Sequence, residues 1–230
     1  MAIGFLDGKV MIWNMDKQLT IKQCVFDPKE WSEVMKYNPS ESLLAVGSHD
    51  NHVYIYESKG YSLLTKCVAH SSYITCLDWA ADKNTIRTNC GAYELLYFDI
   101  PNKQTPVTKN DPRGAATNWD TNWASLSIKF EWAVQGIFPI EVGSDGTHIN
   151  SVDTNFSKNI IVTGDDFGLI NILNYPCIEN WQSIRLKAHS EHVCKIWFAA
   201  DGDYIISTGG YDQTIFVWKW QGASFTFAEE

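Results

Sequence analysis

The segment Asp212-Gln-Thr-Ile-Phe-Val-Trp218 has a turn-forming aspartate, then alternating apolar residues, then a closing tryptophan. Three other segments follow the same plan, and a fifth is a weaker copy. They are Asp7–Trp13, Asp50–Tyr56, Gly168–Leu173 and, as the weaker copy, Ala92–Phe98. The copies close at positions 13, 56, 98, 173 and 218, so the intervals are 43, 42, 75 and 45 residues. Strand patterns that recur about every 40–45 residues are typical of four-stranded propeller blades.

Strand-like segments precede the copies. Three aliphatic runs, Ser42–Gly47, Ile160–Gly164 and Tyr204–Gly209, stop at glycine, as a strand does when it enters a tight turn. Further upstream, Tyr73–Trp79 and Val193–Phe198 alternate with period two. No amphipathic helix is evident in the sequence. We therefore predict an all-β protein, a β-propeller of the WD-repeat type.

The five copies predict about four full blades and one partial blade within residues 1–230, with blades ending near the closing positions. Ala2–Gly4 matches the end of a second strand, so the first blade is expected to lack its innermost strand. WD-repeat rings usually have seven blades, and ring closure protects strand edges. We expect missing sequence or another chain to complete the ring; closure with fewer blades is the alternative.

The interval between the third and fourth copies exceeds one blade by about 30 residues, which places an insertion at about 100–136. Its first part is polar, and its second half is too aromatic for a solvated spacer, so that half is expected to pack onto the propeller or add a strand. Ordered insertions often carry function. We expect partner contacts at Arg113, Trp119, Trp123 and Trp132; a core role for the tryptophans is the alternative.

In the last copy, His189, Thr208, Asp212 and Trp218 resemble the hydrogen-bond tetrad of WD repeats. In that arrangement the carboxylate accepts from the imidazole, and the hydroxyl contacts both the imidazole and the indole N–H. A buried network is stable only when every polar member has a partner. Other copies replace the tryptophan, by Tyr56, Phe98 and Leu173. We expect those blades to depend mainly on packing.

Composition narrows the class of protein. The net charge of −9 excludes a nucleic-acid binder that reads phosphates by bulk charge, and 45% hydrophobic residues are enough for a core. Six cysteines without a CxxC pair predict buried free thiols in a reducing compartment, rather than disulfides. Neither a signal peptide nor an apolar run long enough to span a membrane is evident. We therefore expect a cytoplasmic protein without a membrane partner.

Possible sites of chemistry are few. His49–His52, the pair His189 and His192, and Asp145 with Asp165–Asp166 are groups of metal-ligand types. Turn and tetrad chemistry explains each of them more simply, because aspartate favours tight turns. No catalytic motif is present. We expect no catalytic residue, cofactor or metal, and an enzyme is the less favoured alternative.

Several longer segments go beyond the general repeat pattern. They are Gly47–Tyr56, His70–Trp79, Trp119–Trp132 leading into Val134–Pro139, Gly143–Asn150, Thr163–Gly168, Tyr175–Cys177 and Ser207–Gly210. Together these segments resemble the echinoderm microtubule-associated protein-like family. The resemblance covers nearly the whole chain, including the insertion that generic WD repeats lack. It corresponds to part of the second of the two propellers in that family, at its C-terminal end.

The resemblance implies a non-catalytic WD-repeat protein that binds tubulin, microtubules or other axonemal proteins through propeller faces and loops. It implies a place in the cytoplasm and cytoskeleton and, for some members, in cilia. A general protein-interaction scaffold without direct tubulin contact is the alternative. Microtubule surfaces are acidic and this chain is negative, so binding needs a local basic face or an apolar, shape-matched contact.

Overall fold

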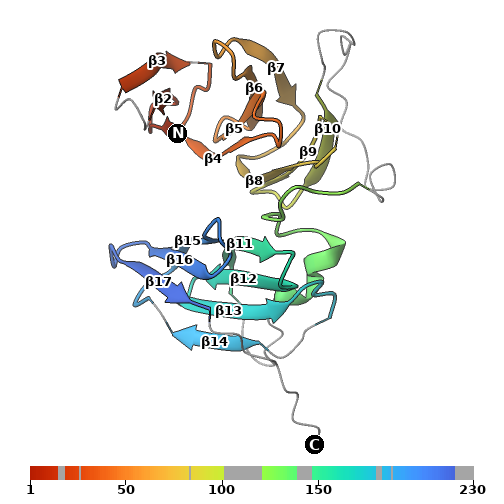
Figure 1. The fold of residues 1–230 in the computed structure, drawn as a ribbon, viewed down its shortest axis with the longest axis vertical. Helices are drawn as coiled ribbons and strands as arrows, with labels where there is room; N and C mark the ends of the chain where they lie inside the picture. The colour runs from red at the N-terminus through yellow and green to blue at the C-terminus, as the bar shows by residue number, and fades with distance from the viewer. Residues whose placement is uncertain are drawn as a thin grey trace, which may run out of the picture. The chain divides into compact units, whose positions relative to one another are not determined.

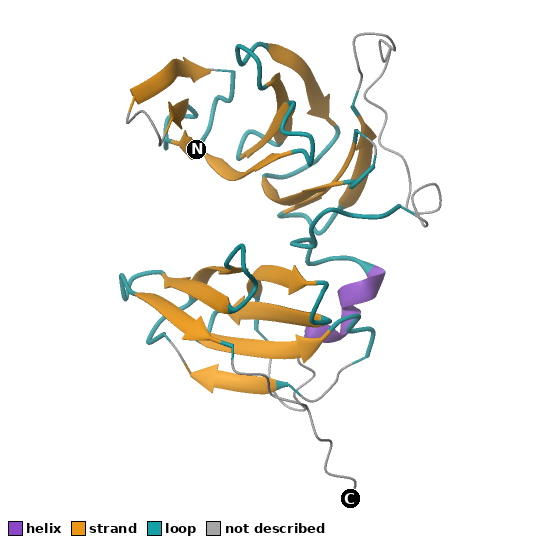
Figure 2. Cartoon of the chain, in the orientation of Figure 1, coloured by secondary structure: helices purple, strands orange, loops and turns teal. Residues whose placement is uncertain are grey.

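The computed structural model is almost entirely β-structure (Figure 2). It describes residues 1–14, 19–25, 27–82, 84–100, 121–138, 147–179, 183–187 and 189–220. The chain divides into two compact units, Met1–Phe130 and Glu131–Glu230, and each is described by itself. Each unit is built from successive antiparallel sheets, which we number as blades 1 to 5 in chain order.

The first unit contains blades 1 to 3 (Figure 1). Blade 1 consists of β1 (Ala2–Gly4), β2 (Val10–Asn14) and β3 (Leu19–Val25). Blade 2 consists of β4 (Ser32–Tyr37), β5 (Leu43–Ser48), β6 (His52–Glu57) and β7 (Leu63–Val68). Blade 3 consists of β8 (Ile74–Trp79), β9 (Thr85–Cys90) and β10 (Leu95–Asp99). In every blade, consecutive strands are neighbours in the sheet.

The second unit contains blades 4 and 5. Blade 4 consists of β11 (Ile149–Asn155), β12 (Ile160–Asp165), β13 (Leu169–Asn174) and β14 (Ile184–Lys187). Blade 5 consists of β15 (Val193–Phe198), β16 (Tyr204–Gly209) and β17 (Ile215–Lys219). A short 3-10 helix, η2 (Trp132–Ile137), lies at the end of the predicted insertion, where the sequence predicted no helix.

The residues that close the five sequence copies all lie on strands, namely β2, β6, β10, β13 and β17. In blades 1, 2 and 4 a further strand follows the closing residue: β3, β7 and β14. The closing residue therefore marks a strand within the blade, and the last strand of these blades comes after it.

The apolar cores lie between consecutive blades of the same unit. All six residues of β5 are buried, because both faces of blade 2 are covered. Leu44 and Val46 pack with the core shared with blade 1, and Leu43 and Ala45 pack with the core shared with blade 3. Blades 4 and 5 share a third core. Burying one such aliphatic side chain contributes about 1.5–3 kcal/mol, so stacking against a neighbour stabilises each blade.

Glycine at the end of the second strand is required by close packing between blades. A Cβ atom on Gly47 would lie 2.7 Å from Cγ2 of Ile74, on the first strand of the next blade. A Cβ atom on Gly164 would lie 2.4 Å from Cγ1 of Val193 in the same relation. The sequence pattern assigned these glycines to the turn. In the structure they lie within β5 and β12, and the neighbouring blade leaves no room for a side chain.

Cys67, Cys76, Cys90, Cys177 and Cys194 carry free thiols, and all but Cys194 are buried. This agrees with the predicted free cysteines, while the side chain of Cys24 lies outside the described residues. Among the helices of the described residues, none has the length and apolar character needed to cross a membrane.

Candidate functional site

A buried hydrogen-bond network joins the loop before blade 5 to its second and third strands. His189 Nδ1 lies 2.9 Å from Asp212 Oδ2, and Nε2 lies 2.9 Å from Ser207 Oγ. The Trp218 indole N–H donates to the same Ser207 hydroxyl at 3.2 Å. Burial alone would raise the pKa of Asp212, but hydrogen bonds from the Thr214 backbone N–H and the His189 ring bring it below its usual value. The carboxylate is therefore ionised and fixes the imidazole.

The hydroxyl in this network belongs to Ser207, so the assignment of Thr208 was wrong. Successive side chains of a strand point to opposite faces, and only one of two adjacent hydroxyls can face His189. The structure brings His189, Asp212 and Trp218 together as predicted, and Thr208 lies one position too far along β16.

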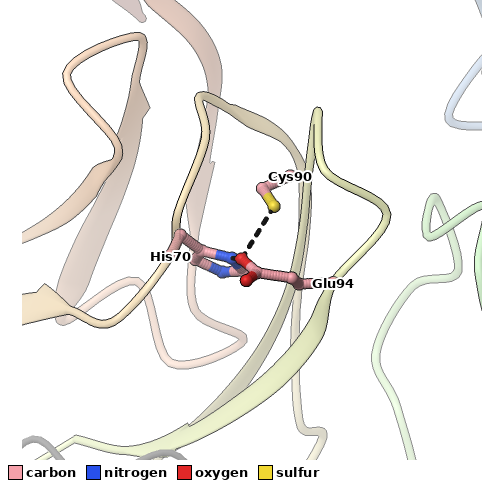
Figure 3. Close-up of side chains that lie close together, drawn as sticks. All are labelled: His70, Cys90 and Glu94. Atoms are coloured by element: carbon pink, nitrogen blue, oxygen red, sulfur yellow. Dashed lines mark hydrogen bonds and ion pairs between the residues drawn. The ribbon is translucent and has the colours of Figure 1, made fainter.

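Blade 3 contains a related network that the sequence analysis missed. His70 Nε2 lies 2.6 Å from Thr88 Oγ1, and Nδ1 lies 3.2 Å from Glu94 Oε2. The Cys90 thiol donates to Glu94 Oε2 at 3.0 Å (Figure 3). Ser71 holds the same carboxylate through its backbone N–H at 3.0 Å and its hydroxyl at 2.8 Å. Glutamate thus occupies the place of Asp212, with a thiol added beside it.

The protonation states in blade 3 follow from these contacts. Hydrogen bonds, above all from Cys90 and Ser71, lower the pKa of Glu94 to about 2, so its carboxylate is ionised. Burial lowers the pKa of His70, although Glu94 opposes this, so the imidazole is neutral near pH 7. Burial raises the pKa of the Cys90 thiol, with a further contribution from Glu94. The three groups therefore form a neutral imidazole, an anionic carboxylate and a protonated thiol.

A spacing in the sequence could have revealed this second network. In both blades the histidine precedes the hydroxyl residue by 18 positions. The acid follows the histidine by 24 positions in blade 3 and by 23 in blade 5. The sequence pattern did not indicate this network because blade 3 has glutamate in place of the aspartate and Phe98 in place of the closing tryptophan.

The second half of the predicted insertion packs onto blade 3 around a buried carboxylate. Asp78 on β8 accepts from Lys36 Nζ at 2.8 Å and from the Arg87 guanidinium at 3.3 Å. Ser125 Oγ donates to it at 2.6 Å, and the Ser127 backbone N–H donates at 2.9 Å. Burial alone would raise the pKa of Asp78, but the two cations hold it well below its usual range. Residues 121–130 therefore belong to the packed structure of blade 3.

Trp123 takes part in this packing, and so the alternative of a structural role fits it. Its backbone forms an isolated bridge with Ala80, and its ring lies 4.3 Å from the Arg87 guanidinium carbon. Tyr97 is tilted against it, with ring centroids 5.9 Å apart. The indole is half-buried, which leaves part of it accessible.

The metal-ligand types named from the sequence are engaged in other contacts. His49 stacks between Trp31 and Tyr73, with ring centroids 3.7 and 4.5 Å away. Asp50 accepts from the Tyr54 hydroxyl at 2.6 Å and from the His52 backbone N–H at 3.2 Å. Asp50 therefore acts as a turn carboxylate.

The aspartates of blade 4 are also engaged in hydrogen bonds within the protein. Asp165 accepts from the backbone N–H groups of Phe167 and Leu169, each at 2.9 Å. Asp166 accepts from the Asn150 amide at 2.8 Å, and Asp145 lies outside the described residues. Beside blade 5, the rings of His192 and Tyr211 pack edge to face, with their centroids 6.0 Å apart. His192 therefore does not form a pair with His189.

Exposed apolar side chains recur at one kind of turn in both units. The turn that leads into the strand of the closing residue carries such a residue in four of the five blades. They are Phe5 and Leu6 in blade 1, Tyr93 in blade 3, Phe167 in blade 4 and Tyr211 in blade 5. Leu6 is 83% exposed and Tyr211 is 85% exposed. In blade 2 the corresponding turn carries His49, whose stack includes the partly exposed Trp31 and Tyr73. We call these residues the turn-tip set.

A family model described as the second β-propeller of echinoderm microtubule-associated protein matches residues 1–220. The chain belongs to the echinoderm microtubule-associated protein family. This confirms both the predicted family and the predicted propeller fold, and it places the chain in the second propeller.

Family relatives match along most of the chain. The ciliary WD repeat-containing protein ctxp80 of Euplotoides octocarinatus is 45% identical and covers 95% of this chain. The 77 kDa echinoderm microtubule-associated protein of Strongylocentrotus purpuratus is 36% identical, and echinoderm microtubule-associated protein-like 4 of Xenopus tropicalis is 39% identical, each over 95% of the chain. The chain spans 30%, 31% and 23% of these three relatives' own lengths.

A solved structure supports the fold independently. A chain in the crystal structure of the mitotic checkpoint complex has a TM-score of 0.71 and is 15% identical. The match covers 95% of this chain and 70% of that chain. At this identity the likeness shows the shared fold alone.

In this member of the microtubule-associated family, the four residues expected to contact a partner have different positions. Trp132 begins η2 and is 54% exposed, so its indole is accessible. Trp123 is held by Arg87, as described above. Trp119 and Arg113 lie outside the described residues.

Proposed function

We propose that this chain is a non-catalytic WD-repeat module that acts on the microtubule cytoskeleton, including that of cilia. The match of residues 1–220 to the family's second propeller carries this proposal. Relatives that share the sequence are named as microtubule-associated and ciliary proteins. The module binds tubulin or an axonemal protein, and it contributes contacts rather than chemistry.

The residues of the turn-tip set are the proposed partner contacts, taken separately in each unit. Large exposed apolar groups such as Leu6, Tyr93 and Tyr211 supply contact area, and tyrosine is enriched among residues that dominate binding energy. An apolar contact also suits the charge, because a chain of net charge −9 is not attracted to an acidic microtubule surface over long range. Trp132 and the accessible part of Trp123 extend this proposal, as do Trp119 and Arg113 from the sequence.

We further propose that another blade, from additional sequence or a second chain, completes the ring beside blade 5. Ile215 and Val217 on β17 are largely exposed, whereas the equivalent faces of blades 1, 2 and 4 are covered by the next blade. Covering these side chains would also protect the strand edge. Gel filtration of the purified chain reports whether copies associate.

Co-sedimentation with microtubules across a salt series tests the main proposal. A folded chain should pellet with microtubules, and pelleting should persist at moderate salt because an apolar contact is weakly screened. Two separate variants, Leu6→Ala in the first unit and Tyr211→Ala in the second, should each weaken binding by about tenfold. Their matched controls are Leu63→Ala and Tyr204→Ala, which remove a partly exposed leucine and tyrosine at the start of a strand in the same unit, and both should bind normally.

A protein-interaction scaffold without tubulin contact is the second candidate, and the net charge of −9 favours it. A folded chain that fails to pellet at any salt concentration would support this candidate against direct tubulin binding. If a turn-tip variant and its matched control reduce pelleting equally, the contact lies on another surface.

A further inference from the structure

Beyond any contact surface, blade 3 brings together three side chains of the types that bind transition metals. Ligand atoms of His70, Cys90 and Glu94 all lie within 4.8 Å of one another. Figure 3 shows that the three side chains converge from separate segments: the loop before β8, the end of β9 and the turn before β10. His70 and Cys90 are buried, so their donor atoms are already removed from bulk water.

We propose that His70, Cys90 and Glu94 bind a Zn²⁺ ion through Nδ1, the thiolate Sγ and Oε2. Thiolate and imidazole ligands suit zinc, whereas magnesium and calcium prefer sites made of oxygen atoms. The thiol proton passes to water when the metal binds, and a water molecule completes the fourth position. The Glu94 side chain is one-third exposed, which leaves a route for the ion.

The distances fit a tetrahedral site. Cys90 Sγ lies 3.0 Å and His70 Nδ1 lies 3.2 Å from Glu94 Oε2. Zinc bonds of about 2.0–2.3 Å place ligand atoms roughly 3.3–3.7 Å apart in a tetrahedron. The two distances to Glu94 Oε2 therefore need to lengthen by only a few tenths of an ångström to admit the ion, and Cys90 Sγ and His70 Nδ1 lie within 4.8 Å of each other.

The neighbours of the three ligands support both the empty and the loaded site. Without metal, His70 Nδ1–H donates to Glu94, and Nε2 accepts from the Thr88 hydroxyl. With metal on Nδ1, Nε2–H donates to Thr88 Oγ1, whose own proton turns to the Leu96 carbonyl at 3.4 Å. A second hydrogen bond of this kind orients metal-bound histidines and raises their basicity. Ser71 meanwhile holds the Glu94 carboxylate in place.

Blade 5 shows what the site requires, because it has the same network without a thiol. Gly209 occupies the position of Cys90, two residues after the hydroxyl residue in each blade. A Cβ atom there would lie 1.8 Å from Asp212 Oδ1 and 2.5 Å from His189 Nδ1. The Thr214 hydroxyl also lies 2.9 Å from His189 Nδ1. Blade 5 therefore has neither the third ligand nor room for it.

A cobalt titration of the tag-free chain tests the proposal, since Co²⁺ reports thiolate ligands by near-ultraviolet charge transfer and tetrahedral geometry by visible absorption. The chain should bind one equivalent of Co²⁺ with both features, and Zn²⁺ should displace it. Cys90→Ser should lose the charge-transfer band and weaken binding by more than about tenfold. Glu94→Gln, which keeps the thiol, should also weaken binding.

Cys76→Ser is the matched control, because it removes another buried free thiol of blade 3 that lies outside the cluster. It should keep the cobalt spectrum. Zn²⁺ should raise the melting temperature of the natural chain and of Cys76→Ser relative to chelator, and should not raise that of Cys90→Ser. A folded natural chain without the charge-transfer band overturns the proposal, as does a Cys90→Ser chain with the unchanged band.

Discussion

Blades 3 and 5 share a strand plan but differ in chemistry at matched positions. In each, a loop histidine precedes the hydroxyl residue by 18 positions and is bonded to an acid in the next turn. Blade 5 closes its network with an indole donor from Trp218 and leaves glycine beside the acid. Blade 3 lacks the indole, and in place of that glycine it has Cys90, whose thiol lies beside the acid. One backbone arrangement thus accommodates either a network complete in itself or a set of metal ligands.

The second difference lies on the first two strands. Asp78 pairs with Arg87 across β8 and β9, where blade 5 pairs Trp197 with Ile206 across β15 and β16. The buried ion pair of blade 3 is covered by residues 121–130, which supply hydroxyl and backbone donors. Trp197 is partly exposed. A blade can hold a buried charge only where another segment supplies the hydrogen bonds that replace water.

Breaking the charge network of blade 3 should give the largest effect. Asp78→Asn leaves Arg87 and Lys36 without their buried counter-charge, so we expect a loss of about 3–5 kcal/mol in the free energy of unfolding. Urea denaturation measures this loss. Trp197→Phe, at the matched position of blade 5, should cost less than about 1.5 kcal/mol because the ring is partly exposed. Equal losses in the two variants would contradict the comparison.

Adding one carbon at the matched turn position should affect the two blades unequally. Gly209→Ala forces a Cβ atom against Asp212 and His189, and we expect a loss of about 1–3 kcal/mol. Cys90→Ala keeps a Cβ atom that blade 3 already accommodates, so without metal its cost should be smaller. Urea denaturation in the presence of chelator compares the two variants. A larger loss for Cys90→Ala would contradict the assignment of Gly209 and Cys90 to equivalent positions.

The hydroxyl of the blade 5 network can be identified by a pair of adjacent substitutions. Ser207→Ala leaves the Trp218 indole N–H without its acceptor, so we expect a loss of about 1–3 kcal/mol on urea denaturation. Asp212→Ala should also lower the midpoint of urea denaturation. Thr208→Ala serves as the control and should cost less, because its hydroxyl is not in the network. A larger loss for Thr208→Ala than for Ser207→Ala would restore the assignment made from the sequence.

The smallest expected effect is a pH dependence in blade 3. Because folding lowers the pKa of Glu94 from 4.5 to about 2, its ionised form stabilises the fold above pH 4.5. This contribution is lost as the pH falls from 4.5 towards 2. The difference in melting temperature between the natural chain and Glu94→Gln, measured with chelator, should therefore shrink on acidification through this range. A difference that grows would mean that the neutral carboxyl is the form favoured by the fold.

The fold was readable from the sequence because its periodicity is local. In blade 2, Val53 and Ile55 face one core while Tyr54 and Tyr56 face the other, and the same alternation of apolar residues is visible in the other copies of the sequence pattern. The sequence explained the role of the glycines less completely. Nothing near Gly47 in the sequence indicates Ile74, which lies on the next blade and excludes a side chain.

The networks were only partly readable. His189, Asp212 and Trp218 follow a known spacing, but the choice between two adjacent hydroxyls depends on which face of β16 each occupies. The cluster around Asp78 could not be predicted in the same way. Its partners Lys36 and Ser125 lie 42 and 47 positions away along the chain, so only the folded sheet brings them together.

The stacking of blades also sets how easily each strand opens. All residues of β5 are buried, so its amides should exchange with deuterium only when the whole unit unfolds. The residues of β17 are exposed or half-buried, so its amides should exchange through local fraying at a small cost in free energy. Hydrogen exchange at β17 therefore serves as a built-in reporter: any partner that covers blade 5 slows exchange there while leaving β5 unchanged.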